Sequence, residues 1–153
     1  MKKIIEQLQQ SVNDALPKLS SISEEEFTAK PNPNKWSKKE ILGHLVDSAI
    51  NNTTRFVQAQ YDEHLKVDYS GDKWVAITGY QSCNKNSLIP LWKLLNEHIC
   101  VILENMPADK YENLCESGDP EPRTLKWLAE DYVTHLNHHL AQLMKEGGAS
   151  SSQ

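Results

Sequence analysis

Apolar residues recur at steps of three and four along four long stretches of the chain, which is the spacing of a helix that buries one face. The stretches cover residues 2–19, residues 38–60, a segment from Asn86 or Ser87 to Met106, and residues 124 to about 146. The predicted buried stripes are Ile4, Ile5, Leu8, Val12, Leu16 and Leu19; Ile41, Leu42, Leu45, Val46, Ala49, Ile50, Phe56 and Val57; Leu88, Leu91, Trp92, Leu95, Ile99, Ile102, Leu103 and Met106; and Leu125, Leu128, Ala129, Tyr132, Val133, Leu136, Leu140 and Leu143.

The second of these helices has the clearest start. Ser37 is suited to cap the helix and Glu40 stands three residues later, which is the spacing of a capping box. Trp36 before the cap and Ile41 after it are placed to pack together as a hydrophobic staple. The sequence therefore fixes the beginning of this helix at Lys38.

Shorter elements and turns connect the helices. Residues 23–27 and 72–78 are expected to form short helices, the second of them inside a long connection spanning 61–86, and 108–123 form a turn-rich loop. No segment has a convincing strand pattern. Gly147 and Gly148 are typical of a helix end. We predict an all-α four-helix bundle with short extra helices, in one domain over residues 1–146, followed by a flexible tail over 147–153.

Composition excludes several classes of protein. With 153 residues, 39% hydrophobic and 24% charged, the chain is suited to one soluble domain with a real core. A net charge of −5 disfavours nucleic acid as a partner, because phosphate binding needs a basic patch. No apolar run is long enough to span a membrane or to act as a secretory signal. Cys83, Cys100 and Cys115 are widely spaced, which favours reduced thiols and a cytoplasmic location.

The predicted second helix has an unusual polar side, which lacks Lys and Glu even though these residues normally cover a solvated helix face. His44, Ser48, Asn51 and Arg55 follow one another at i, i+4, i+7 and i+11 and form a continuous stripe, with Asp47 beside it. Such a stripe is better suited to lining a cleft than to facing bulk water. The polar residues of this side are Gly43, His44, Asp47, Ser48, Asn51, Thr54 and Arg55.

Three of the six histidines fall within five residues of the predicted fourth helix. His135 and His139 stand one turn apart at i and i+4 and lie at one edge of the apolar arc, whereas His138 falls outside it. Paired histidines at the rim of a bundle core are typical of helical metal sites. The alternative is chance, because this spacing is common and a single histidine such as His44 is more often hydrogen-bonded than bound to a metal. His64 and His98 are expected at the surface.

The order of these features resembles the DinB/YfiT-like superfamily, and within it the YfiT-like metal-dependent hydrolases and bacillithiol transferases. The resemblance runs from about Ser23 to Met144. It rests on the segment WSKKEILGHLVDS at residues 36–48, followed by Asn51, Arg55, Phe56 and, far downstream, His135, His138 and His139. The family resemblance implies a bundle of up-down-down-up type.

The resemblance also implies one divalent ion, zinc or nickel, held by His44, His135 and His139. Three protein ligands leave a coordination position open, as in catalytic sites. The resemblance implies an enzyme that transfers a low-molecular-weight, bacillithiol-like thiol to an electrophile. The alternatives are a metal-dependent hydrolase and a non-catalytic metal- or ligand-binding stress-response protein. Such bundles also allow a homodimer.

Neighbouring polar residues have two interpretations each. Asp47 is either an acceptor that orients a metal ligand or bound water, or a carboxylate on the helix surface. Arg55 either holds an anionic group of the substrate or pairs with Asp47 or a nearby glutamate. Ser48 and Asn51 lie on the same stripe and are candidates for substrate binding.

Overall fold

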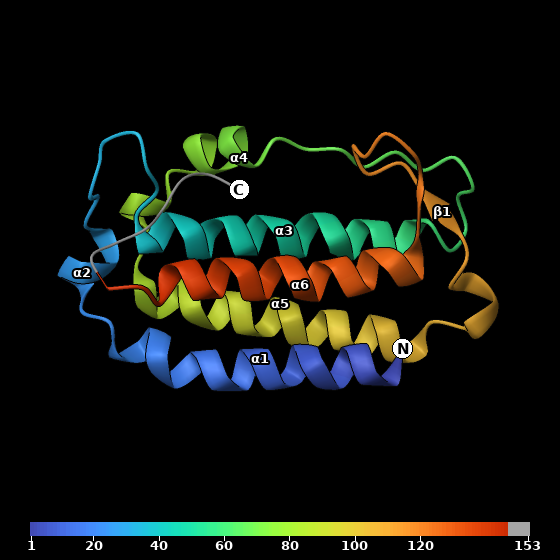
Figure 1. Ribbon diagram of the computed structural model, residues 1–153, viewed down its shortest axis with the longest axis horizontal. Helices are drawn as coiled ribbons and strands as arrows, with labels where there is room; N and C mark the ends of the chain where they lie inside the picture. The colour runs from blue at the N-terminus through green and yellow to red at the C-terminus, as the bar shows by residue number, and fades with distance from the viewer. Residues whose placement is uncertain (147–153) are drawn as a thin grey trace.

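Four long helices lie side by side in the computed structural model, which describes residues 1–146 (Figure 1). They are α1 (Lys2–Ser21), α3 (Lys38–Gln58), α5 (Lys85–Asn105) and α6 (Leu125–Leu143). Shorter elements occupy the connections: α2 (Glu24–Thr28), α4 (Gly71–Thr78), the 3₁₀ turns η1 (Tyr80–Ser82) and η2 (Ala108–Lys110), and the strands β1 (Leu114–Cys115) and β2 (Arg123–Thr124). The predicted all-α four-helix bundle is confirmed.

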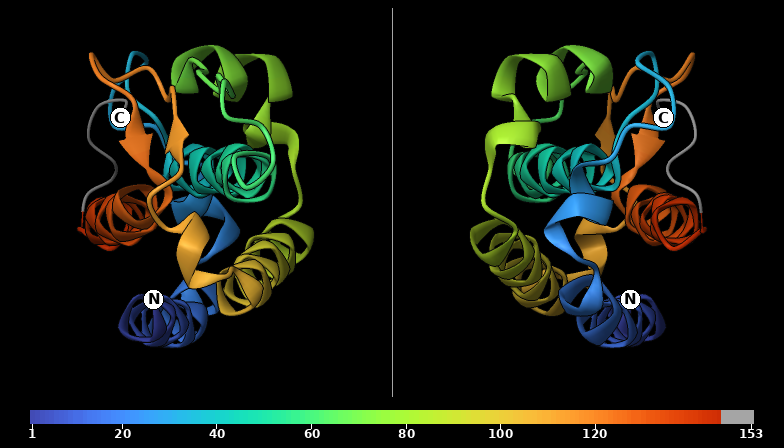
Figure 2. Two further views of the ribbon diagram at one scale, coloured as in Figure 1. Left: turned by 90° about the vertical axis from the view of Figure 1, so that its right-hand side faces the viewer. Right: turned by 90° about the vertical axis from the view of Figure 1, so that its left-hand side faces the viewer.

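The helices run up, down, down and up, as the family resemblance implied (Figure 1). This order arises because residues 59–84 cross back along the bundle, so α3 and α5 run in the same direction. Both α1 and α3 pack against α5 and α6, and α4 packs on the outer side of α3. Viewed along the axis, α4 and the crossover cover the side of α3 that faces away from α1 (Figure 2).

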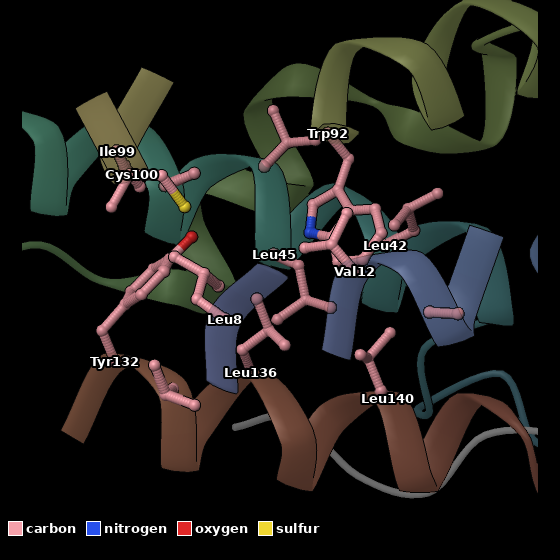
Figure 3. Packing of buried hydrophobic residues seen from close by; sticks show 14 of the residues in the cluster. Leu8, Val12, Leu42, Leu45, Trp92, Ile99, Cys100, Tyr132, Leu136 and Leu140 are labelled. Carbon is pink, nitrogen blue, oxygen red and sulfur yellow. The ribbon is translucent and has the colours of Figure 1, made fainter. Parts of the chain in front are cut away.

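The core fills the space between the four long helices. Each helix contributes large apolar side chains to it, and those at its centre include Leu8, Val12, Leu42, Leu45, Trp92, Ile99, Leu136 and Leu140 (Figure 3). Three residues of the predicted stripes depart from the prediction, because Ile50 is 39%, Val57 is 40% and Leu91 is 45% exposed. Ile50 and Val57 are on α3, and Leu91 is on α5.

The start of α3 matches the sequence prediction. The Ser37 hydroxyl accepts a hydrogen bond from the Glu40 backbone N–H at 3.1 Å, and the Glu40 carboxylate accepts one from the Ser37 N–H at 2.9 Å. Trp36 is buried beside this cap. The helix begins at Lys38 as predicted, which sets the rotation of every side chain that follows it.

Other boundaries differ from the prediction by a few residues. The helix α5 begins at Lys85 rather than at Asn86 or Ser87, because the Asn84 side chain accepts the Asn86 N–H and caps it earlier. The helix α6 ends at Leu143, three residues before Glu146. The predicted flexible tail, 147–153, lies outside the described residues.

The prediction of no strands was wrong. Strands β1 and β2 pair antiparallel, with Leu114 opposite Thr124 and Cys115 opposite Arg123. The next residue, Glu116, exchanges backbone hydrogen bonds with Leu65 and Val67 of the crossover. Strands of two residues are too short to show an alternating pattern in the sequence. They tie the loop after η2 to the crossover, and both segments lie over α3. Among residues 1–146, no helix is both long and apolar enough to cross a membrane.

Candidate metal centre

The imidazoles of His44, His135 and His139 meet between α3 and α6, beside the crossover. His44 comes from the second turn of α3, and the other two come from successive turns of α6. The Nε2 atom of His135 lies 3.2 Å from Nε2 of His44 and 3.1 Å from Nε2 of His139. The fold therefore brings together side chains that are 91 positions apart in the sequence.

The spacing of these nitrogens fits a metal-ligand set. Zinc–imidazole bonds of 2.0–2.1 Å at tetrahedral angles place ligand nitrogens about 3.3 Å apart. The two measured separations are 3.1 and 3.2 Å, and one ligand atom from each histidine lies within 4.8 Å of the others. Hydrogen bonds among the three rings would not satisfy them, because Nε2 of His135 holds at most one proton and faces two neighbours. A shared cation satisfies all three lone pairs.

A buried glutamine orients His139. The Gln142 Oε1 atom lies 2.9 Å from Nδ1 of His139, and an amide oxygen can only accept, so Nδ1 carries the proton. The lone pair of His139 is then on Nε2, the atom that faces the other two histidines. The Gln142 amide nitrogen lies 3.3 Å from Nε2 of the exposed His138 and can donate to it. His138 is thus outside the cluster, as the sequence predicted, but it helps to hold Gln142.

Burial keeps the three histidines neutral. Loss of solvent, followed by the proximity of His135 and His139, lowers the pKa of His44 from 6.5 to about 3. Burial and the neighbouring histidines lower the pKa of His135 to about 4, and burial also lowers the pKa of His139. Neutral imidazole is the form that binds metals, so the cluster needs little deprotonation at neutral pH.

The ring of His44 is enclosed closely by other segments. The Trp36 ring packs against it with centroids 4.9 Å apart. On another side lies Gly71, where a Cβ would fall 2.9 Å from Cε1 of His44, so only glycine leaves room for the ring. Its Nδ1 atom is buried without a hydrogen-bond partner among residues 1–146. The Oδ2 atom of Asp47, one turn further along α3, is buried and equally without a partner.

Asp47 is not a surface carboxylate, so that alternative was wrong. It is 1% exposed, and its Oδ1 accepts a hydrogen bond from the Tyr80 hydroxyl of η1. Burial raises the pKa of Asp47 from 3.8 to about 6, and the Tyr80 hydrogen bond opposes that rise. The Tyr80 ring lies over Gly43, where no side chain would fit. The role of Asp47 in orienting a metal ligand or bound water stays a prediction.

A cavity of about 340 Å³ opens beside the cluster. It is lined by α3, the crossover, the loop after β1, and α6, through Trp36, His44, Arg55, Tyr69, Ser70, Gly71, Asp72, Ser117 and His135. Of the predicted substrate-binding residues, Arg55 is part of this lining. Ser48 and Asn51 are buried and make hydrogen bonds within α3, to Asn52 and to the Asp47 carbonyl. Their proposed contact with substrate stays a prediction.

Sequence reasoning missed several residues of this site. Gln142 follows His139 by three positions, so the shared helix face was the available signal. Tyr69 and Ser117 come from loops, and Gly71 begins the short helix α4, so no periodic pattern in the sequence describes where they lie.

Known sequences similar to this chain include a family profile and two relatives. The sequence profile of the DinB superfamily matches residues 7–143. A relative from Halalkalibacterium halodurans, named as an inferred metal-dependent hydrolase, is 25% identical over 126 residues, which cover 82% of this chain and 73% of the relative. A relative from Bacillus mycoides with a name of the same kind is 23% identical over 144 residues, covering 92% of this chain and 82% of the relative.

Solved structures share the fold. YfiT from Bacillus subtilis, described as a probable metal-dependent hydrolase with an unusual four-helix bundle topology, matches with a TM-score of 0.83 at 20% identity, covering 97% of this chain and 88% of that one. A mycothiol-dependent maleylpyruvate isomerase matches with a TM-score of 0.79 at 13% identity, covering 95% of this chain and 61% of the other.

Proposed function

Because this chain belongs to the DinB superfamily, we propose that it is a divalent-metal-dependent enzyme that transfers a low-molecular-weight thiol to an electrophile. The observation that supports the proposal most directly is the convergence of three Nε2 atoms beside a cavity. Convergent, neutral imidazoles and an adjoining space for a small molecule are the two requirements of an open metal site.

The proposed ligands are His44, His135 and His139. Zinc and nickel both suit a set of three imidazoles, so we propose one of these two ions. A divalent ion held there would supply Lewis acidity, which makes a thiol or a water nucleophilic at neutral pH.

The chain's own residues would position the reactants. Gln142 holds the His139 ring in the tautomer that points Nε2 at the cluster. Trp36 and Tyr69 line the cavity and give its wall aromatic surface. In the transfer step, the thiol loses its proton to solvent, its sulfur forms a bond to the electrophilic carbon, and the leaving group departs with its electron pair. For a chlorinated electrophile, the products are a thioether, chloride and a proton.

A hydrolase is the second candidate, in which water takes the place of the thiol. The names of the two relatives favour it. The dependence of the structurally similar isomerase on mycothiol favours thiol chemistry. A non-catalytic metal- or ligand-binding protein is the third candidate.

Metal analysis tests the site. Untagged protein is expected to contain close to one zinc or nickel ion per chain, and the His44→Ala and His135→Ala variants are expected to contain far less. His98→Ala is a matched control, because His98 is exposed on α5. Purified protein without a divalent ion that also fails to take up added zinc or nickel would contradict the proposal.

A conjugation assay tests the reaction. Metal-loaded protein is mixed with monochlorobimane and a panel of thiols that includes bacillithiol, and fluorescence reports the thioether. Metal-dependent conjugation with at least one thiol is expected, and it should disappear in His135→Ala. A metal-loaded protein that is inactive with every thiol but cleaves esters or amides would favour the hydrolase, and one inactive in both assays would favour a binding protein.

A further inference from the structure

Arg55 is a buried cation without a carboxylate partner. It is 8% exposed and lies near the end of α3. Among residues 1–146, no carboxylate oxygen lies within the 4.0 Å of an ion pair with its guanidinium, so the predicted pairing with Asp47 or a nearby glutamate is absent. Burying a charge without a partner of opposite charge lowers the stability of the folded protein. The position of Arg55 in a cavity wall therefore calls for an explanation.

Backbone oxygens hold the Arg55 side chain in place. Its Nε and Nη2 atoms donate to the Val67 carbonyl at 3.0 and 2.7 Å, and Nη2 also donates to the Ser117 carbonyl at 3.2 Å. Nη1 reaches the Asn52 side-chain oxygen at 3.4 Å. Since a guanidinium has five N–H groups, these four contacts leave one N–H of Nη1 without a partner in the described part of the chain. The contacts orient the group but do not neutralise its charge.

The guanidinium shares the cavity wall with two of the three clustered histidines. Arg55, His44 and His135 all line the same 340 Å³ space. An imidazole is either neutral or cationic, so the histidines do not offset the positive charge. The Tyr69 ring lies 5.9 Å from the guanidinium carbon and adds a flat apolar surface to the same wall. A small molecule with a negative group and an apolar body fits these surroundings.

Three acidic residues lie around this part of the molecule, and none of them forms an ion pair with Arg55 in the described part of the chain. Asp72 lines the cavity from α4 but is exposed to solvent. Asp47 is hydrogen-bonded to Tyr80. Asp131 on α6 is exposed and forms no ion pair with Arg55 within the described chain. The cavity beside Arg55 thus retains an unsatisfied positive charge.

We propose that Arg55 forms a carboxylate-binding subsite in this cavity, so that one of the two reactants of the proposed enzyme bears a carboxylate. A fixed orientation, one free N–H, a full charge and burial of the side chain favour a charge-assisted hydrogen bond to a carboxylate. The role in catalysis rests on the proposed function, whereas binding of a carboxylate by Arg55 does not require the metal.

Binding to metal-free protein tests the subsite directly. Benzoate and benzamide have the same shape and differ in charge, so the ratio of their dissociation constants, measured by calorimetry, isolates the carboxylate. We expect benzoate to bind the wild-type protein at least about tenfold more tightly than benzamide, since charge-assisted hydrogen bonds are the stronger kind. In Arg55→Met the ratio should fall close to one.

Two further variants separate charge recognition from folding. Arg55→Lys retains the charge but not the set of hydrogen bonds to the Val67 and Ser117 carbonyls that orients the guanidinium, and it should keep part of the preference for benzoate. Arg123→Met is the matched control, because Arg123 stacks on Trp127 and pairs with Asp119 outside the cavity lining. Its ratio should equal that of the wild-type protein. Equal affinity of the wild-type protein for the two probes, or an unchanged ratio in Arg55→Met, would overturn the subsite.

A kinetic experiment on metal-loaded protein assigns the carboxylate to one reactant. The thiol is tested with 4-mercaptobutyrate and its amide against monochlorobimane, and the electrophile with 4-(chloromethyl)benzoate and its amide against 2-mercaptoethanol. One acid should exceed its amide by about tenfold or more in kcat/KM, and Arg55→Met should remove that difference. Conjugation without such a difference overturns the subsite and leaves the proposed function standing. If the protein shows no conjugation but binds benzoate more tightly than benzamide in an Arg55-dependent way, the subsite stands and the proposed function is overturned.

Discussion

The hydrogen bond from His139 to Gln142 should affect how tightly the site binds a metal ion. Outer partners of this kind fix the ring and its tautomer, and their removal typically lowers metal affinity by about 10- to 100-fold. We expect Gln142→Ala to weaken zinc binding at least about tenfold, measured by competition with a chromophoric chelator.

Two variants serve as comparisons for that measurement. Gln142→Glu keeps an acceptor for the His139 Nδ1–H and should retain the affinity of the wild-type protein. Gln10→Ala removes an exposed glutamine that bonds only Asp14, and should have no effect. Equal affinity in Gln142→Ala and the wild-type protein would show that the hydrogen bond does not orient the ligand.

Because the pKa of Asp47 is raised by burial, the stability of the folded protein should depend on pH. The Asp47 pKa is raised in the folded state to about 6 from 3.8, so between these pH values the folded protein binds more protons at this group than the unfolded chain does. The contribution of Asp47 to stability is therefore largest below pH 4 and falls as the pH rises through 6. The whole difference is at most about 3 kcal/mol, because one pKa unit corresponds to about 1.4 kcal/mol.

The variant Asp47→Asn isolates this effect in metal-free protein. Asparagine keeps an oxygen to accept the Tyr80 hydroxyl but does not titrate. The difference in unfolding free energy between variant and wild type should move in favour of the variant between pH 4 and pH 6.5 and then level off, as followed by urea denaturation at several pH values. A difference that does not change with pH would contradict the raised pKa.

Helical spacing was enough to predict the pair His135 and His139, which lie on one face of α6. His44 was joined to this pair by the family resemblance, because its position in the polar stripe of α3 does not by itself indicate a ligand. The burial of Asp47 could not be predicted, since Tyr80 reaches it from a different segment, 33 positions away. The same is true of Arg55. Its partners are the carbonyls of Val67 and Ser117, and backbone oxygens leave no signal in the residue types.

At the scale of elements, long helices with capping residues were predictable and short strands were not. The capping box at Ser37 located the start of α3 to the residue, because it depends on neighbours in the sequence. Pairing of β1 with β2 and of Glu116 with the crossover depends on contacts between distant segments. The crossover matters most for the site, since it supplies Tyr69 and Gly71 and covers the polar face of α3.

Close packing of the crossover on α3 gives a prediction about Gly43. In an ordinary helix, replacing glycine by alanine stabilises by about 1 kcal/mol. At Gly43 the new Cβ would collide with the Tyr80 ring, and overpacking costs about 1–3 kcal/mol. We expect Gly43→Ala to lower the unfolding free energy, measured by chemical denaturation.

A double-mutant cycle separates this collision from other effects. In a Tyr80→Ala background the ring is gone, so adding Gly43→Ala should be neutral or stabilising. If Gly43→Ala has the same effect with and without the Tyr80 ring, the packing of η1 on α3 is not the cause.

At the scale of the whole molecule, the cluster joins two antiparallel helices. His44 is on α3 and His135 and His139 are on α6, so an ion bound to all three would link elements that separate on unfolding. Ligands that bind only the folded state stabilise it by about 2.7 kcal/mol at a free concentration of one hundred times Kd. For a chain of this size, that corresponds to a rise in Tm of about 5–11 °C.

The metal-induced rise in Tm tests whether an ion links α3 to α6 through His44. Zinc or nickel should raise the Tm of the wild-type protein and of the His98→Ala control by this amount, followed by calorimetry after chelation and reloading. In His44→Ala, the remaining ligands lie one turn apart on α6, and an ion held by them no longer connects that helix to α3. Loss of one ligand weakens binding, so at a free ion concentration of about one hundred times the wild-type Kd the metal-induced rise in Tm should be small in this variant. A full rise in His44→Ala at that same concentration would mean that His44 is not a ligand.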